Sequence, residues 1–184
     1  MTTKRTFHDI GEHRERGISL LETAIAVAIV AIVGASALPS FTALVEGRRL
    51  EAAATRLAAD IQFVRGEAIV RNRSLRLSVR TGADATCWIV HTGAPADCSC
   101  AAAGAVCTGE ALAIKSVVLP DRERVGVAGN VASITFDPLH GTSTPTGTLR
   151  LTDARGRAVH HVVNVLGRVR SCSPEGAVPG YPTC

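Results

Sequence analysis

The sequence predicts an α+β protein in which one long N-terminal helix packs on antiparallel β-sheet. Three observations support this prediction: a predominantly apolar run over residues 18–38, an amphipathic helical pattern over residues 39–73, and an alternation of apolar and polar residues that begins at Ser74. Of the 184 residues, 46% are apolar and 20% are charged, which indicates a folded chain with one modest domain beside the apolar run.

The apolar run is long enough to be a membrane span. As a helix, residues 18–38 cross about 30 Å of hydrocarbon. Arg14 and Arg16 directly precede the run, which favours a cytoplasmic N-terminus and places the rest of the chain across the membrane. The alternative is a secretory signal peptide cleaved within "GASALP". Such peptides have a shorter apolar core of about 7–15 residues, so a membrane span is the preferred interpretation.

One carboxylate, Glu22, lies a turn inside this run, where burial in hydrocarbon costs about 2.5–3.5 kcal/mol. One explanation is that the side chain reaches the cytoplasmic headgroups, about 6–8 Å away along the helix. The other is that the chain is cut after Gly17, which gives Ile18 a new α-amine. That amine would neutralise Glu22, within one chain or between neighbouring helices whose axial register the pair would set.

The residues around this cut resemble the class III signal of type IV pilins and pseudopilins. The shared features are a short charged leader (residues 1–17), a glycine before the cut, an apolar start, a glutamate fifth after the cut, and a proline, Pro39, that closes the first span. Ile18 stands where phenylalanine is usual. The resemblance implies that a prepilin peptidase cleaves after Gly17 and N-methylates Ile18. It also implies assembly with minor and major pilin subunits at the inner membrane.

The helical pattern continues beyond Pro39, which we expect to kink the helix rather than to end it. An apolar stripe recurs at steps of four and three, and its members are Leu50, Ala54, Leu57, Ile61, Val64 and Ala68. The opposite side is polar and carries Arg48, Arg49, Glu51, Arg56, Asp60 and Glu67. We therefore expect one kinked helix over about residues 18–72, whose stripe packs on the remaining chain.

The remaining residues, 74–184, form the predicted β-rich domain. Alternating patterns predict strands at 74–80, 86–93, 112–119, 131–137, 148–153 and 157–170. A hairpin turn at 153–156 joins the last two, which would start a second sheet. Residues 94–109 and 137–147 are rich in small residues, Gly, Pro and Thr, and we expect exposed loops there.

The order and spacing of these segments resemble the FimT/GspH branch of the pseudopilins over nearly the whole chain. The resemblance is carried by "ADIQFVRGEAIVRNR", "CWIVHTG", "ITFDPLHG" and "GRVR". It implies a type IV pilin-like fold, with a long kinked N-terminal helix, the first half of which spans the membrane, packed on antiparallel sheets. The β-rich domain would then lie in the periplasm.

All six cysteines follow the apolar run, and a periplasmic location favours disulfides. Six cysteines permit 15 pairings. We expect Cys172 to pair with Cys184, which would close a Pro/Gly-rich tail, and we prefer Cys87–Cys98 with Cys100–Cys107 for the others. The alternative, a zinc site of Cys98, Cys100, Cys107 and His91, lacks the usual ligand spacing.

The sequence offers little for enzymatic chemistry, and we expect neither a catalytic residue nor a cofactor nor a metal. A P-loop, an H-E-x-x-H motif and a G-x-S-x-G motif are all missing from the sequence. His160 and His161 would point to opposite faces of a strand, without a nucleophile beside them.

The C-terminal quarter of the chain is basic. Residues 148–174 carry five arginines against Asp153, a net charge of +4, and these arginines are Arg150, Arg155, Arg157, Arg168 and Arg170. In "GRVR", Arg168 and Arg170 would share one face of a strand about 6–7 Å apart, close to the spacing of phosphates along a nucleic acid. Gly167 would let the backbone approach closely or bulge. The alternative is a solvated strand end that aids solubility or binds acidic groups of a neighbouring subunit.

FimT-type minor pilins linked to natural transformation are similar at this place, where G-R-x-R is taken as a DNA-contact motif. By this resemblance Arg168 and Arg170 are the leading ligands for duplex DNA, bound through its phosphates without sequence preference. Three functions remain open: a DNA-binding minor pilin that assists uptake, a minor pseudopilin of a type II secretion system, and a minor pilin that only initiates pilus assembly. The basic segment favours the first of these.

Overall fold

The computed structural model describes residues 19–82, 84–101 and 104–184, with the backbone alone at residues 36–39. By its internal contacts the chain divides into two units, residues 1–41 and residues 42–184. One helix, α1 (Leu20–Val70), contributes to both units and is long and apolar enough to cross a membrane. The predicted cut between Gly17 and Ile18 lies outside the described residues, and a kink at Pro39 stays a prediction.

The helix ends where the sequence predicts. Asn72 adopts a left-handed conformation (φ 47°), which asparagine tolerates better than most residues. The backbone N–H of Arg73 donates to the carbonyl of Ala68 at 3.1 Å, a bond that satisfies a carbonyl otherwise left open at a helix end. After this cap the chain turns back and enters the sheets.

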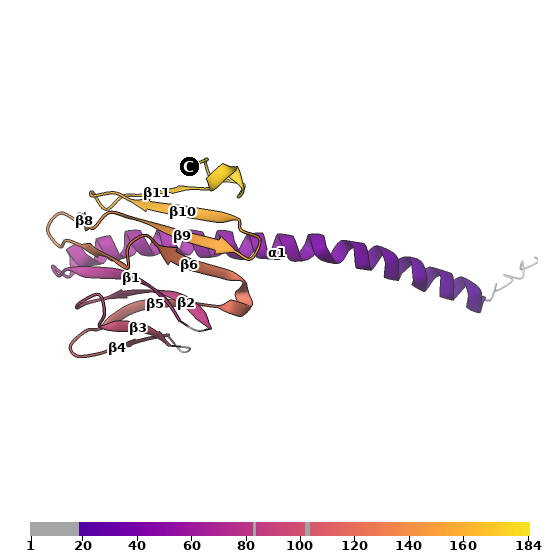
Figure 1. Ribbon diagram of the computed structural model, residues 1–184, viewed down its shortest axis with the longest axis horizontal. Helices are drawn as coiled ribbons and strands as arrows, with labels where there is room; N and C mark the ends of the chain where they lie inside the picture. Colours follow the sequence, from indigo (N-terminus) through magenta and orange to yellow (C-terminus); the bar gives the residue numbers. More distant parts are fainter. Residues whose placement is uncertain (1–18, 83, 102–103) are drawn as a thin grey trace, which may run out of the picture. The chain divides into compact units, whose positions relative to one another are not determined.

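Two antiparallel sheets pack on the second half of α1. The five-stranded sheet has the order β5 (Ala113–Pro120), β2 (Ala85–His91), β1 (Leu75–Thr81), β7 (Ser133–Phe136), β8 (Ser143–Thr144). The four-stranded sheet has the order β11 (Val169–Cys172), β10 (Ala158–Val163), β9 (Gly147–Asp153), β6 (Val125–Gly129). In the view of Figure 1, β10 and β11 lie above this part of α1, β9 overlaps it, and β1, β2 and β5 lie below it.

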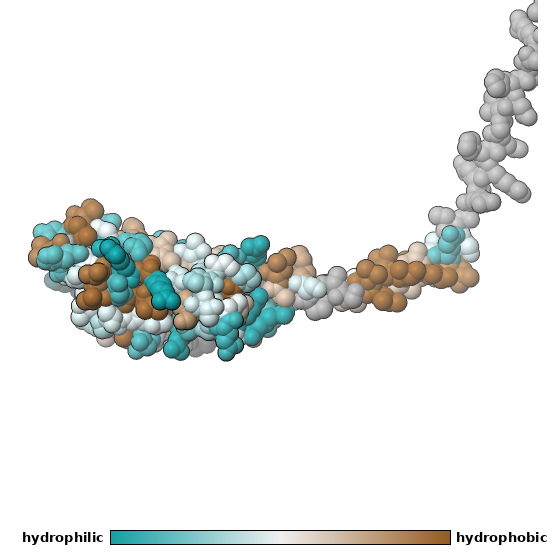
Figure 2. Space-filling view, turned by 90° about the horizontal axis from the view of Figure 1, so that it is seen from above, coloured by the Kyte–Doolittle hydropathy of each residue, from teal (hydrophilic) through white to brown (hydrophobic). Residues whose placement is uncertain are grey.

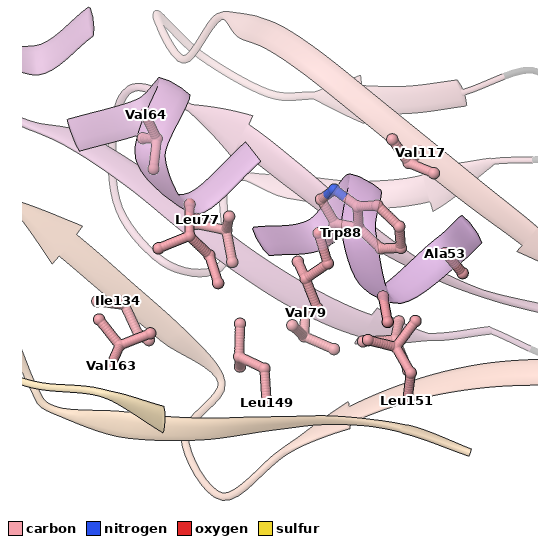
Figure 3. Close-up of a cluster of buried hydrophobic side chains, with 14 of the residues drawn as sticks. Ala53, Val64, Leu77, Val79, Trp88, Val117, Ile134, Leu149, Leu151 and Val163 are labelled. Carbon is pink, nitrogen blue, oxygen red and sulfur yellow. The ribbon is translucent and has the colours of Figure 1, made fainter. Parts of the chain in front are cut away.

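One core joins the helix and both sheets. All six residues of the predicted apolar stripe are fully buried, which confirms that this face of α1 packs on the sheets. Figure 3 shows the cluster, in which Leu77 and Trp88 of the five-stranded sheet lie near Leu149 and Leu151 of the other. Burial of this apolar surface is the main term that stabilises the unit of residues 42–184.

The polar side of the helix was predicted only in part, because Asp60 is buried rather than solvated. Its carboxylate accepts hydrogen bonds from Trp88 Nε1 at 2.8 Å and from Lys115 Nζ at 2.5 Å. Lys115 Nζ also lies 5.4 Å from the ring centre of Phe63. Buried charges need partners of this kind, so Asp60 fixes α1 to β2 and β5.

The structure corrects one predicted strand and two predicted loops, and it adds a strand that was not predicted. The expected strand over residues 157–170 is two strands, β10 and β11, because residues 164–167 form a tight turn. The expected loop over residues 94–109 contains a hairpin, β3 (Cys98–Ala101) and β4 (Gly104–Cys107), and the loop over 137–147 contains the short strand β8. Strand β6 was missed altogether.

The β3–β4 hairpin covers the outer face of the five-stranded sheet and creates a small second core. Its buried members are Cys87, Ile89, Cys98 and Ala111. Cys98 lies directly opposite Cys107 in the hairpin and bonds to it, while Cys100 bonds to Cys87 on β2. The preferred pairing of Cys87–Cys98 with Cys100–Cys107 is therefore wrong, because the hairpin register brings Cys98 and Cys107 together. The Cys172–Cys184 bridge is confirmed.

Candidate functional site

The described residues of the N-terminal unit expose apolar side chains on every side of the helix. The large ones are Leu20, Leu21, Ile25, Val27, Ile29, Val30, Ile32, Val33 and Phe41. Glu22 lies in the first turn of α1 and is also exposed. An apolar surface of this extent is not stable in water, so this helix fits a single-pass membrane anchor or a helix packed among others.

The C-terminal basic segment contains two exposed arginines at the end of the four-stranded sheet. Arg168 follows the β10–β11 turn and Arg170 lies on β11, with Val169 packed against the core between them. Because neighbouring side chains of a strand alternate, both guanidinium groups leave from the outer face. Neither group forms an ion pair with any residue that the structure describes.

Gly167 builds the turn that presents these arginines. Its φ is +70°, and a Cβ at this position would lie 2.4 Å from the carbonyl oxygen of Gly141. Its backbone N–H donates to the carbonyl of Asn164 at 2.9 Å, and Asn164 Oδ1 accepts the N–H of Arg168 at 3.0 Å. Only glycine fits here, so this residue positions the motif rather than contacting a ligand.

Arg150 also belongs to the outer face of this sheet. It lies on β9 between the buried Leu149 and Leu151, and it pairs in register with His160 on β10. Burial, together with the positive charge of Arg150, lowers the pKa of His160 below its ordinary value. This face therefore carries positive charge on both sides of β10, at Arg150 on β9 and at Arg170 on β11.

The other two arginines of the segment have carboxylate partners. Arg155 Nε lies 2.8 Å from Glu46 of α1, which also binds Arg124 at 3.0 Å. Arg157 Nε lies 2.7 Å from the buried Asp153. The sequence predicts that Arg155 and Arg157 belong to the DNA-contact residues, but both form ion pairs within the protein. They attach the β9–β10 turn to the helix.

The ligands of the alternative zinc site have other partners. Cys98, Cys100 and Cys107 are all in disulfides. His91 is buried, with Nε2 2.8 Å from Ser78 Oγ and Nδ1 2.8 Å from the carbonyl oxygen of Thr92. Burial lowers the pKa of His91, which keeps the ring neutral and suits a structural role.

Figure 2 views the globular unit from above, where strongly hydrophilic side chains and hydrophobic surface alternate. A long apolar N-terminal helix that packs with its second half on antiparallel sheets, beside an electropositive outer sheet face, defines a type IV pilin-like protein.

The comparisons identify the family. Residues 53–167 match the family described as type II transport protein GspH, and the chain belongs to that family. Among solved structures, the fold is similar to the crystal structure of the type IV minor pilin FimU of Pseudomonas aeruginosa strain PAO1, with a TM-score of 0.51 and 17% identity. The match covers 70% of this chain and 94% of that one. A search of curated proteins found no match.

Proposed function

We propose that this chain is a non-enzymatic minor pilin of a type IV pilus that binds duplex DNA and assists its uptake in natural transformation. Arg168 and Arg170 would contact successive phosphates, and Arg150 would extend the contact across the sheet. The observation that carries the proposal is that both arginines are exposed without an ion pair among the described residues, whereas Arg155 and Arg157 are ion-paired. Free guanidinium groups on one face suit phosphate contact without sequence preference.

We propose that the chain is first inserted into the inner membrane and processed there. A prepilin peptidase would cut after Gly17 and methylate Ile18, and the domain of residues 74–184 would lie in the periplasm. In the mature chain Glu22 would neutralise the new α-amine and set the register with neighbouring subunits. The exposed apolar helix supports this role, because it needs lipid before assembly and other helices afterwards.

Salt titration of DNA binding tests the proposal. The full chain in nonionic detergent should shift duplex DNA, and log K should fall linearly with log salt concentration, by about 0.9 for each phosphate contact. Replacing Arg168 and Arg170 together by glutamine should flatten that slope by about 1.8. The matched control replaces Arg49 and Arg56, which are exposed on α1 and form no ion pair within the described chain. Equal weakening by both double variants would mean diffuse attraction and would refute a site at "GRVR".

The second candidate is a minor pseudopilin of a type II secretion system, and the third is a minor pilin that initiates assembly without a ligand. The description of the matching family, type II transport protein, favours the second. Deletion of the gene separates the three: loss of DNA uptake with normal piliation supports the first, loss of exoprotein secretion the second, and loss of piliation the third.

A further inference from the structure

The turn that precedes Arg168 carries two apolar residues at its tip. Residues 164–167 form a tight turn closed by the bond from Gly167 N–H to the carbonyl of Asn164 at 2.9 Å. Val165 and Leu166 occupy its centre and are 58% and 50% exposed. Central turn positions usually carry glycine, proline or small polar residues, so this pair is unexpected on structural grounds.

The turn belongs to a larger apolar end of the globular unit. Leu139 lies in the neighbouring loop between β7 and β8 and is 73% exposed. Ser143 joins the two segments, because its N–H donates to Val165 O at 2.9 Å and its hydroxyl donates to Asn164 O at 2.6 Å. The same loop is held to α1 by Arg65 Nε, which donates to Gly141 O at 3.0 Å. Hydrogen bonds therefore hold the apolar tip to Ser143, and the loop beside it to α1.

Arginines outnumber unpaired carboxylates beside the tip. Arg168 follows it directly, and Arg65, which binds Gly141 O, has its Nε 3.0 Å from the place of a Cβ at Gly167. Asp137 Oδ1 accepts the N–H groups of Leu139 and His140 at 3.0 Å, and Glu67 binds Arg71 at 2.6 Å. The excess of positive charge therefore favours an anionic partner that also accepts apolar side chains. Duplex DNA offers both, because phosphates flank stacked base pairs between which apolar side chains can insert.

We propose that Val165 and Leu166 form a wedge that enters duplex DNA between adjacent base pairs while Arg168 and Arg170 hold the flanking phosphates. This inference rests on the proposed DNA binding and states how that site engages its ligand. Only Gly167 separates Leu166 from Arg168, so the apolar tip and the first arginine leave the same tight turn, and insertion and phosphate contact are compatible. Insertion unstacks a base step and bends the duplex.

The wedge has two measurable consequences. Part of the affinity does not depend on salt, because apolar contact releases no counterions. A duplex with a central mismatch also binds more tightly than the matched duplex, because the mismatched step costs less to unstack. Arginine contacts to phosphate alone give neither effect.

The test compares Val165→Ser with Leu166→Ser, made together, against the wild type, using the full chain in nonionic detergent. Serine is common in turns, so the turn should persist, and thermal unfolding of each protein checks this. We expect the double variant to bind about tenfold more weakly at every salt concentration, with an unchanged salt slope and no preference for the mismatched duplex. The matched control is Val106→Ser with Leu112→Ser, an exposed Val and Leu pair (55% and 63%) beside the β3–β4 hairpin, which should leave binding unchanged.

Three results would overturn the wedge. If wild type and double variant bind matched and mismatched duplexes alike, the wedge is refuted while binding through Arg168 and Arg170 stands. If the double variant binds DNA normally but is lost from sheared filaments, the apolar end is a subunit contact instead. If the wild type shifts no duplex even at low salt, the wedge and the proposed function fall together.

Discussion

Two arginines lie in the turn before β10 and two follow the turn after it, yet the structure uses the two pairs differently. At the β9–β10 turn, Arg155 and Arg157 bind the buried carboxylates of Glu46 and Asp153. At the β10–β11 turn, Arg168 and Arg170 have no such partner among the described residues. The first pair stabilises the fold and the second is available to a ligand. Charge counted along a sequence does not separate these roles, because Glu46 lies 109 residues before Arg155.

The largest expected effect is at the neutralised turn. Asp153→Ala removes a buried carboxylate that accepts the N–H groups of Arg155 and Arg157 at 3.0 and 2.9 Å and the Nε of Arg157 at 2.7 Å. Three donors then lose their acceptor, so the free energy of unfolding should fall by about 3 kcal/mol. Urea denaturation measures it. A loss below about 0.5 kcal/mol would show that this turn does not stabilise the fold.

Acidification should destabilise the protein through the buried face of β10. His161 lies on the buried face, where burial lowers its pKa to about 4. Its folded-state pKa lies below its unfolded value of about 6.5, so its contribution is present above pH 6.5 and is lost as pH falls towards 4. The wild type should lose about 3 kcal/mol over this range relative to His161→Leu. Denaturation at pH 7 and pH 4 gives the difference, and parallel losses in both proteins would contradict it.

Gly167→Ala should destabilise the β10–β11 turn by straining its backbone. The change places a Cβ against Gly141 O in a left-handed conformation, which should cost about 1–3 kcal/mol of unfolding free energy. It should weaken DNA binding as well, although no charge is removed. Gly156→Ala is a useful comparison, because its φ is also positive (+81°) but a Cβ there meets nothing within 4 Å. Equal stability of the two variants would mean that the approach to Gly141 relaxes at no cost.

The smallest effects compare single arginines at the two ends. Arg155→Gln removes one of the two ion pairs of the buried Glu46, which keeps its pair with Arg124. The free energy of unfolding should therefore fall by about 1 kcal/mol. Arg168→Gln should change the free energy of unfolding by less than about 0.5 kcal/mol, because the side chain is exposed. Thermal unfolding of both variants tests the pair, and the opposite order would remove the distinction between the two turns.

The spacing of apolar residues was sufficient to predict the helix and the main strands, because an element that buries one face needs apolar residues at the spacing of that face. The stripe of α1 and the alternation in β1 and β9 are the direct record of a buried side. The turn at residues 164–167 was missed because Val165 and Leu166 continue the apolar pattern of a strand. The β3–β4 hairpin was missed because its small residues show no alternation, and two disulfides hold it together with a small core.

The sequence predicts that arginines form the candidate site, but it does not predict which of these arginines have carboxylate partners within the protein. The sequence gives Arg168 and Arg170 a shared face, and the structure exposes both. It could not exclude Arg155 and Arg157, since their partners are distant in the chain. Asp60 was assigned to the solvated side of α1 because an amphipathic pattern carries no signal for a carboxylate that pairs with Trp88 and Lys115.

The segment that contains the β3–β4 hairpin is an insertion between two strands whose pairing does not depend on it. Residues 92–112 connect β2 and β5, which already pair from His91 and Ala113 onward, and Thr92 N–H donates to Leu112 O at 3.1 Å where the segment begins and ends. A short turn could therefore join the two strands without a change of register, provided that Cys87 and Ile89, then uncovered, became polar. The family could vary or lose this surface while the helix, the sheets and the arginines of β11 stay in place.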